Sequence, residues 1–204
     1  MKTIKILVFG ILLSTFAISQ EIGINTSRLW TNDKELGNPN SFGVYLSKNL
    51  SNYFTLRLSY DYAFNERKYN GSLGSGMDLN SVWEPIETFA DANLLKLSIV
   101  LVPYSSEIVS LNGGFLFSTN YLSVEKQGLQ TQKQNRWDNE QKFGIGYLFL
   151  IRLFPFQSFQ LTININASKE FMSRSTIFVT DVEMPFYQSV NVSSIQFGLG
   201  YIIK

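Results

Sequence analysis

Polar and apolar residues alternate with a period of two along most of the chain after position 20. In the clearest stretch, 53–64, one face carries only phenylalanine, leucine and tyrosine, and the other carries Arg57 and Asp61. The last segment repeats this pattern, with Phe197 and Tyr201 alternating with polar residues and glycine. A period of two indicates strands whose two faces have different surroundings, and no segment sustains the 3.6 period of an amphipathic helix. The chain after position 20 is therefore predicted to be all-β.

The same pattern predicts about eight strands and a regular alternation of connections. The strands lie near 21–30, 40–48, 53–64, 89–102, 108–125, 141–153, 159–171 and 189–203. Short connections, at 49–52, 103–107 and 154–158, alternate with long polar ones, at 31–39, 65–88, 126–140 and 172–188. Short turns at one end and long loops at the other are typical of outer-membrane barrels.

Hydrocarbon contains no water to pair with a free strand edge, so an antiparallel sheet that crosses a membrane must close on itself. About 9–11 residues suffice for a tilted strand to cross, and the predicted strands reach that length. The fold predicted is an eight-stranded antiparallel up-and-down transmembrane β-barrel.

The stretch 143–156 fixes which face meets lipid. Its odd positions, from Phe143 to Leu153, are all apolar, and its even positions include glycines and Arg152. An arginine on the lipid face at the bilayer midplane would cost about 2–4 kcal/mol. Arg152 is therefore predicted to point into the barrel.

By the same phase, charged residues of both signs fill the interior. An eight-stranded barrel is just wide enough to be filled by side chains, so we expect hydrogen-bonded ion pairs rather than a wide water channel. The predicted polar network of the lumen consists of Arg57, Asp61, Lys96, Lys142, Arg152 and Glu170, with Glu21 nearby.

The N-terminus has the organisation of a secretory signal peptide. Lys2 and Lys5 precede an apolar run, and Ala17-Ile18-Ser19 forms a small-x-small cleavage site. The predicted division is a signal peptide at 1–19 and a barrel at 20–204. An N-terminal membrane anchor is the alternative, but the apolar run is short for a spanning helix.

The amino-acid composition excludes several common kinds of catalytic and metal-binding site. The chain has no cysteine and no histidine, which excludes disulfides, Cys/His metal sites and histidine-based triads. Its net charge of +1 with scattered signs gives no basic stripe for nucleic acid. We expect no catalytic residue, no cofactor and no metal. An outer-membrane enzyme acting through Asp61 or Glu170 is an alternative without positive support in the sequence.

Taken together, the leader, the alternating hairpins, the asymmetry of the connections and the final strand Phe197-Gly-Leu-Gly-Tyr-Ile-Ile203 resemble the small outer-membrane β-barrel proteins of the OmpA/OmpX-like porin-family type. The resemblance covers the whole chain after the leader. It implies location in the outer membrane of a Gram-negative bacterium, contact with outer-membrane lipid and lipopolysaccharide, and a non-enzymatic role. In that family the terminal strand is the signal for the barrel-insertion machinery; here the last residue is Lys204 instead of the common aromatic.

Surface contact through the long loops is the function predicted, either with an external partner or in support of the envelope. The candidate contact residues are Tyr69, Trp83, Phe178, Phe186 and Tyr187. Packing of these rings on each other, or a β-hairpin continuing beyond the membrane, is the structural alternative. A narrow pore for small solutes and a soluble lipocalin-type barrel are the other functional alternatives. The chain lacks the disulfides of the lipocalin class, and its sequence predicts no additional helix.

Overall fold

The computed structural model describes residues 21–32, 37–71, 83–132, 134–138, 142–156, 158–179 and 182–203. Side chains are described at these positions except 135–138, 142, 155–156, 170–179 and 182–189. The strands are β1 (Glu21–Thr31), β2 (Asn40–Asn49), β3 (Phe54–Gly71), β4 (Glu84–Ser105), β5 (Val109–Gly128), β6 (Gln134–Asp138), β7 (Lys142–Phe156), β8 (Phe159–Val179) and β9 (Val182–Ile202). Within the described part of the chain, no helix is long and apolar enough to cross a membrane.

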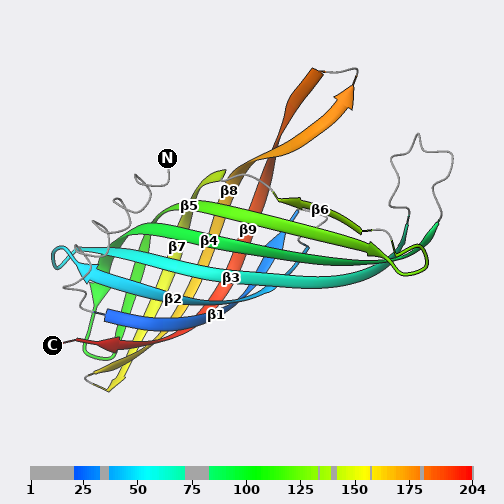
Figure 1. Cartoon of the computed structure of the whole chain (residues 1–204). Helices are drawn as coiled ribbons and strands as arrows, with labels where there is room; N and C mark the ends of the chain where they lie inside the picture. Colours follow the sequence, from blue (N-terminus) through cyan, green and yellow to red (C-terminus); the bar gives the residue numbers. More distant parts are fainter. Residues whose placement is uncertain are drawn as a thin grey trace.

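Eight of these strands form one closed antiparallel ring in chain order, with β6 attached to β5 outside the ring. Closure comes from β1 and β9, which pair from Glu21 and Ile202 at one end to Thr31 and Val192 at the other. Because first and last strands pair, the barrel part of the sheet has no open edge. The predicted up-and-down barrel is confirmed, and Figure 1 shows the strands wrapping around a single axis.

The two ends of the barrel differ in length. Short connections join β2 to β3, β4 to β5 and β7 to β8, and they lie at the same end as the paired residues Glu21 and Ile202. We call this the turn end. At the opposite, extended end, β3, β4 and β5 continue together beyond the ring, and the β8–β9 hairpin leaves in another direction (Figure 1).

Strand lengths at the extended end differ from the prediction. Half of the predicted loop 65–88 is strand, because β3 runs to Gly71 and β4 begins at Glu84. The predicted loop 172–188 is likewise mostly the β8–β9 hairpin, and β6 lies within the predicted loop 126–140. These segments lack the apolar alternation of the barrel. They are strands because their backbones pair with each other, which a search for apolar periodicity does not detect.

Burial alternates along most of each barrel strand. In β1, odd positions from Glu21 to Leu29 are buried and even positions are exposed. In β7, Phe143, Ile145, Tyr147 and Phe149 are exposed, whereas Leu148, Leu150 and Arg152 are buried. The predicted phase of 143–156 is therefore correct, and Arg152 points inward.

Candidate functional site

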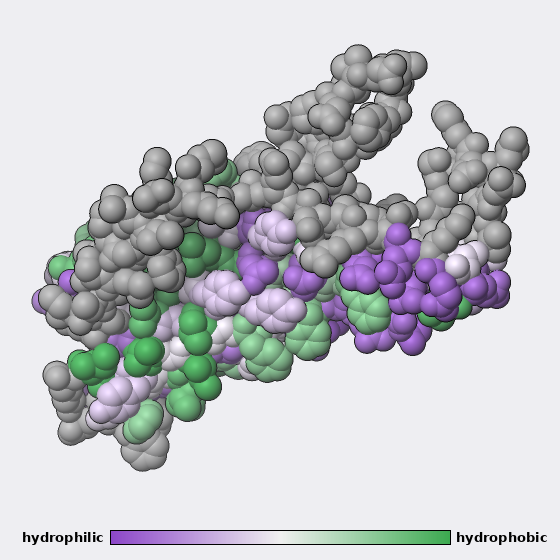
Figure 2. Space-filling model, in the orientation of Figure 1, coloured by the Kyte–Doolittle hydropathy of each residue, from purple (hydrophilic) through white to green (hydrophobic). Residues whose placement is uncertain are grey.

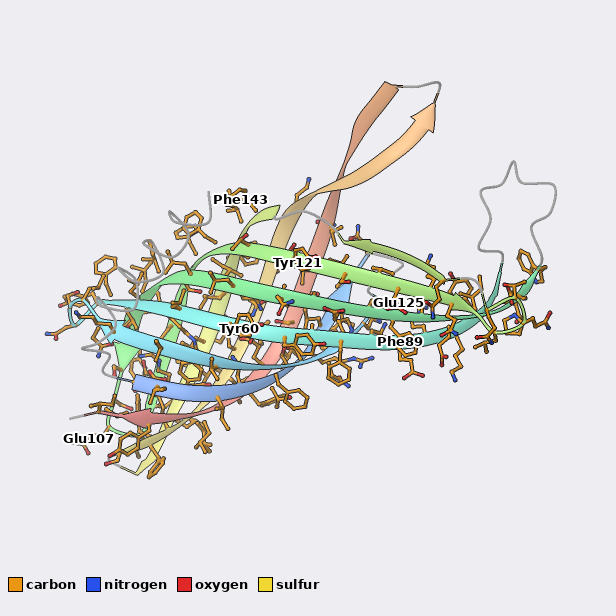
Figure 3. All side chains as sticks on the ribbon, viewed as in Figure 1. Tyr60, Phe89, Glu107, Tyr121, Glu125 and Phe143 are labelled. Carbon is orange, nitrogen blue, oxygen red and sulfur yellow. The ribbon has the colours of Figure 1, made fainter. Side chains whose placement is uncertain are left out.

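The outer wall of the barrel is apolar and exposed. Phe143 is 71%, Tyr147 69% and Ile24 61% accessible, values far above those of a core side chain. Figure 3 shows outward side chains of this kind on three neighbouring strands, at Tyr60, Phe89 and Tyr121. Figure 2 shows that hydrophobic residues gather over the barrel, whereas hydrophilic residues cover the extension of β3 and β4. Such a belt is stable against hydrocarbon and unfavourable against water.

Aromatic rings gather at both ends of the belt. At the turn end, Phe159 and Tyr201 meet edge to face with centroids 5.3 Å apart. Toward the extended end, Phe64 stacks between Phe42, at 6.4 Å, and Tyr62, at 6.3 Å. Rings in two girdles suit the two interfaces of a bilayer, where one side of the ring is apolar and the other is hydrated.

The interior holds a buried ion pair. Lys96 Nζ of β4 lies 2.9 Å from Asp61 Oδ2 of β3, and both side chains are almost inaccessible. A buried charge is tolerated when it is paired and hydrogen-bonded, so each of these residues depends on the other.

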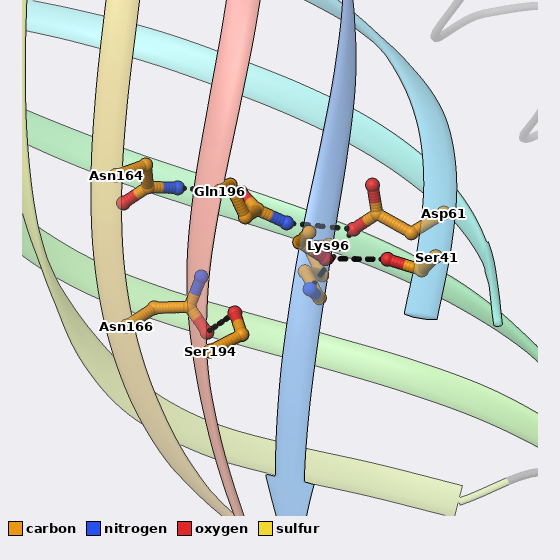
Figure 4. Close-up of polar contacts among 8 residues, drawn as sticks. Ser41, Asp61, Lys96, Asn164, Asn166, Ser194 and Gln196 are labelled. Atoms are coloured by element: carbon orange, nitrogen blue, oxygen red, sulfur yellow. Dashed lines mark hydrogen bonds and ion pairs between the residues drawn. The ribbon is translucent and has the colours of Figure 1, made fainter. Parts of the chain in front are cut away.

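A hydrogen-bonded chain continues from this pair across the lumen (Figure 4). Gln196 Nε2 donates to Asp61 Oδ2 at 3.1 Å, and Asn164 Nδ2 donates to Gln196 Oε1 at 2.7 Å. Since β1 and β2 separate β9 from β3 in the ring, the Gln196–Asp61 bond crosses the interior, whereas Asn164 and Gln196 are register partners on the adjacent strands β8 and β9. Ser194 with Asn166, at 2.9 Å, and Ser27 with Ser41 form a further polar layer.

Arg57 and Tyr45 form a second interior contact. The guanidinium carbon of Arg57 lies 3.6 Å from the centroid of the Tyr45 ring, a cation–π stack of two buried side chains. A Cβ at Gly23, Gly198 or Gly200 would collide with that tyrosine or with groups beside it. Glycines in β1 and β9 thus leave the space in which the Tyr45 ring lies.

Apolar side chains also occupy part of the interior. Leu29, Ala63, Leu94, Leu122 and Val192 belong to one buried cluster. Val100, Leu116, Leu148 and Leu150 form another on the β4–β5–β7 wall. Apolar packing therefore accompanies the hydrogen-bonded ion pairing that was expected in the interior. The Lys96–Asp61 ion pair is one interior contact, and apolar packing and amide hydrogen bonds occupy other parts of the lumen.

No protein-family model and no curated protein matches this chain. Solved structures do. Neisserial surface protein A matches 90% of this chain and 96% of its own at 11% identity, with a TM-score of 0.58. A major outer membrane protein of Thermus thermophilus matches 90% and 98% at 12% identity and 0.57. Ail, the attachment invasion locus protein of Yersinia pestis, matches 91% and 99% at 16% identity and 0.51.

This is the outer-membrane β-barrel fold. Identities this low establish the fold and leave the activity open. The exposed apolar belt of the present chain agrees with that fold independently of the comparisons.

Four of the charged residues predicted for the lumen, Arg57, Asp61, Lys96 and Arg152, lie inside this outer-membrane barrel. The side chains of Lys142 and Glu170 lie outside the described residues. Among the loop candidates, Tyr69 is 42% and Trp83 74% accessible. The side chains of Phe178, Phe186 and Tyr187 are not among those described, although their backbones belong to β8 and β9.

Sequence reasoning missed several interior residues. Tyr45, Gln196 and Asn164 are buried and central to the contacts just described. A signal for Tyr45 exists, because it shares the phase of Ser41, Gly43 and Ser47 and not that of Phe42 and Val44. The hydrogen bond from Gln196 to Asp61 has no comparable signal, since it joins strands that are not neighbours in the ring.

A cavity of about 700 Å³ opens at the turn end of the outer-membrane barrel. Arg152, Gln160, Glu21 and Thr55 are among its lining residues. Arg152 and Gln160 are 6% and 1% accessible. The cavity therefore has buried polar groups in its wall.

Polar contacts organise the extended end. Glu84 Oε2 accepts hydrogen bonds from the backbone N–H groups of Gln130, at 2.7 Å, and Thr131, at 2.8 Å. On the outer face, Lys68 Nζ lies 2.7 Å from Glu87 Oε1. That hydrogen bond raises the pKa of Lys68 and lowers the pKa of Glu87.

A small polar cavity of about 410 Å³ lies at the rim between β1 and β3. Arg28, Asn32, Asn38 and Arg67 contribute to its wall. Among the described residues, no group of three or more acidic, histidine or cysteine side chains is placed to hold a metal ion.

Proposed function

We propose that this protein is a non-enzymatic integral outer-membrane protein of the cell envelope, with a closed lumen and an extended end that makes contacts outside the cell. The proposal includes a signal peptide at 1–19 and a mature barrel at 20–204. The turn end is assigned to the periplasm, because short turns face the periplasm and long connections face outside in this fold. The terminal strand β9 would carry the signal for the barrel-insertion machinery.

The closed lumen carries the proposal. The Asn164–Gln196–Asp61–Lys96 chain runs across the interior, and the cluster around Leu29, Ala63 and Leu122 fills it nearer the extended end. An eight-stranded barrel has room for side chains or for a small ligand but not for both at one level. A continuous water path is therefore unfavourable.

The same contacts argue against catalysis in the lumen. Asp61, a carboxylate considered for an enzyme, is bound to Lys96 and Gln196 and is inaccessible to a substrate. A general acid or base must reach the reacting atom within hydrogen-bond distance.

External contact is supported by the extended end. Tyr69 and Trp83 expose large rings beyond the barrel, and the rim cavity offers Arg28 and Arg67 beside amide side chains. Rings with arginines are frequent in contact surfaces. Ail of Yersinia pestis has been solved with the heparin analogue sucrose octasulfate, and a sulfated saccharide is one class of partner to test here. Lipid and lipopolysaccharide are the proposed contacts of the apolar belt.

Planar-bilayer recording tests the closed lumen. The refolded protein is expected to give no steady conductance. A steady conductance that changes on substitution Arg57→Ala would establish the alternative, a narrow pore for small solutes. External contact is tested by binding of sulfated saccharide to cells that display the protein, with Arg28→Gln/Arg67→Gln as the site variant and Lys48→Gln, a lysine near the turn end, as the control. Equal binding by the wild type, the site variant and the control would exclude the rim cavity as the contact site.

A further inference from the structure

We propose that the cavity at the turn end is a binding site for an oxyanion, a carboxylate or phosphate group presented from the periplasmic side. The orientation rests on the assignment made above; the site itself rests on the buried groups that line it.

Unused hydrogen-bond donors are the first observation. Arg152 Nε and Nη2 are buried and have no hydrogen-bond partner in the described structure, and the buried Gln160 amide has the Tyr45 hydroxyl as a polar neighbour. Arg152 and Gln160 lie on adjacent strands, and both line the same cavity. Buried donors are normally satisfied, so this cluster needs acceptors from something that enters the cavity.

Two acceptors in or beside the wall are already used. Asn49 Oδ1 already accepts the hydroxyl hydrogen of Thr55 at 2.8 Å, and Asn112 Oδ1 accepts that of Ser110 at 2.9 Å. Thr55, Asn49 and Ser110 all line the cavity. These two acceptors are therefore engaged by neighbouring hydroxyl groups, whereas the Nε and Nη2 donors of Arg152 have no partner among the described residues.

Charge is the second observation. Arg152 and Glu21 both line the cavity, and the buried Arg57 pairs in register with the lining residue Ser47, so two guanidinium groups and one carboxylate lie in this part of the lumen. The Lys96–Asp61 pair farther in is neutral as a unit. Arginine does not lose its proton in proteins, so among the described side chains of this cluster one positive charge is unbalanced unless an anion joins it.

These features indicate which chemical class of ligand the cavity would bind. The planar guanidinium fork matches two oxygens of a carboxylate or a phosphate, and the Gln160 amide adds a third donor. The volume, about 700 Å³, is in the range of small-molecule sites, so the anion can be free or can be the end of a larger molecule.

Titration of the refolded, full barrel in detergent tests the site, followed by the NMR resonance of the Arg152 Nε–H group. The probes are sodium acetate, inorganic phosphate, and trialanine with a free or an amidated C-terminus, at ionic strength held constant with sodium chloride. We expect a saturable shift with at least one free oxyanion. A response to acetate or phosphate alone means a free anion, and a response to trialanine acid but not to its amide means a peptide carboxylate.

Two variants confirm the assignment by isothermal titration with the responding probe. Arg152→Gln should weaken binding roughly tenfold to hundredfold, and Gln160→Leu should weaken it by a smaller factor while keeping the charge. Lys48→Gln should leave it unchanged. If Arg152→Gln does not fold, Gln160→Leu and the wild-type resonance decide the question. No saturable shift with any probe, or unchanged binding in the variants, would overturn the proposal.

Discussion

Gln196 of β9 donates a hydrogen bond to Asp61 of β3 across the interior of the barrel. The two strands are separated in the ring by β1 and β2, so this contact couples walls that share no backbone pairing. Asp61 also holds the ammonium group of Lys96. The Asp61 carboxylate therefore joins side chains from three strands, β3, β4 and β9. Its removal should lower the stability of the whole barrel.

Removing Asp61 alone should be more harmful than removing the pair. Asp61→Leu leaves Lys96 charged and unpaired inside the barrel, and the free energy of unfolding should fall by about 3–5 kcal/mol. The double variant Asp61→Leu/Lys96→Met should recover part of that loss. Urea titrations of refolded protein, read by heat-modifiable mobility, measure all three proteins. Strictly additive losses would mean that the two residues are not coupled.

Glycine positions should differ sharply in their tolerance of a methyl group. A Cβ at Gly43 would collide with Asp61 Oδ1, Asn25 Oδ1 and the backbone oxygen of Tyr60, so Gly43→Ala should destabilise by roughly 1–3 kcal/mol. At Gly113 the nearest atom would be 3.9 Å from the Cβ. Gly113→Ala should be neutral or stabilise by about 0.4–1 kcal/mol. The comparison uses the same urea titrations, and equal effects at both positions would refute the crowding at Gly43.

Glu84 should control a local opening at the extended end. Glu84→Gln replaces charge-assisted hydrogen bonds to the N–H groups of Gln130 and Thr131 with weaker ones or none. Amide hydrogen exchange at those two residues should become faster, while exchange in the barrel strands stays the same. Glu107→Gln in an exposed turn at the opposite end is the matched control. Unchanged exchange at Gln130 and Thr131 would show that the turn does not depend on this carboxylate.

The Lys68–Glu87 pair should respond to pH in a defined window. The lowered pKa of Glu87 means that its contribution is present above the ordinary carboxyl value and is lost as pH falls through the lowered pKa. The raised pKa of Lys68 means that its contribution is present below the ordinary amine value and is lost as pH rises through the raised pKa. The pair is therefore intact between those two values.

Carbon-13 shifts of the Glu87 carboxyl group follow this titration directly. In Lys68→Gln the midpoint should move up toward the ordinary value of 4.5. An unmoved midpoint would mean that solvent screens the pair fully, as happens for many exposed ion pairs.

The barrel was predictable from sequence because lipid and lumen impose opposite demands on alternate residues. Phe143 and Arg152 could be assigned to opposite faces from phase and charge alone, and the structure agrees. Beyond the membrane both faces meet water, so the pattern fades, and the continuation of β3 to Gly71 could not be seen. Hydropathy at that end no longer distinguishes a strand from a loop.

Interior partners were less predictable. Lys96 and Asp61 were each expected inside, but the sequence does not state that they bind each other while Arg57 stacks on Tyr45. Those choices follow from the shear of the ring and from glycines that clear space on a neighbouring wall. They are properties of the closed barrel and not of any one strand.

The absence of a side chain at Gly43 limits which substitutions neighbouring positions can accept during evolution. Because Asp61 and Asn25 occupy the space that a side chain at 43 would take, these positions cannot drift independently. A homologue that acquires a larger residue at 43 must shorten the residue at 61 or 25 in compensation. Where the residue at 61 is the one shortened, the charge at 96 must change as well, because Lys96 depends on Asp61. Covariation among the positions equivalent to 25, 43, 61 and 96 should therefore trace this barrel through sequences that have diverged almost everywhere else.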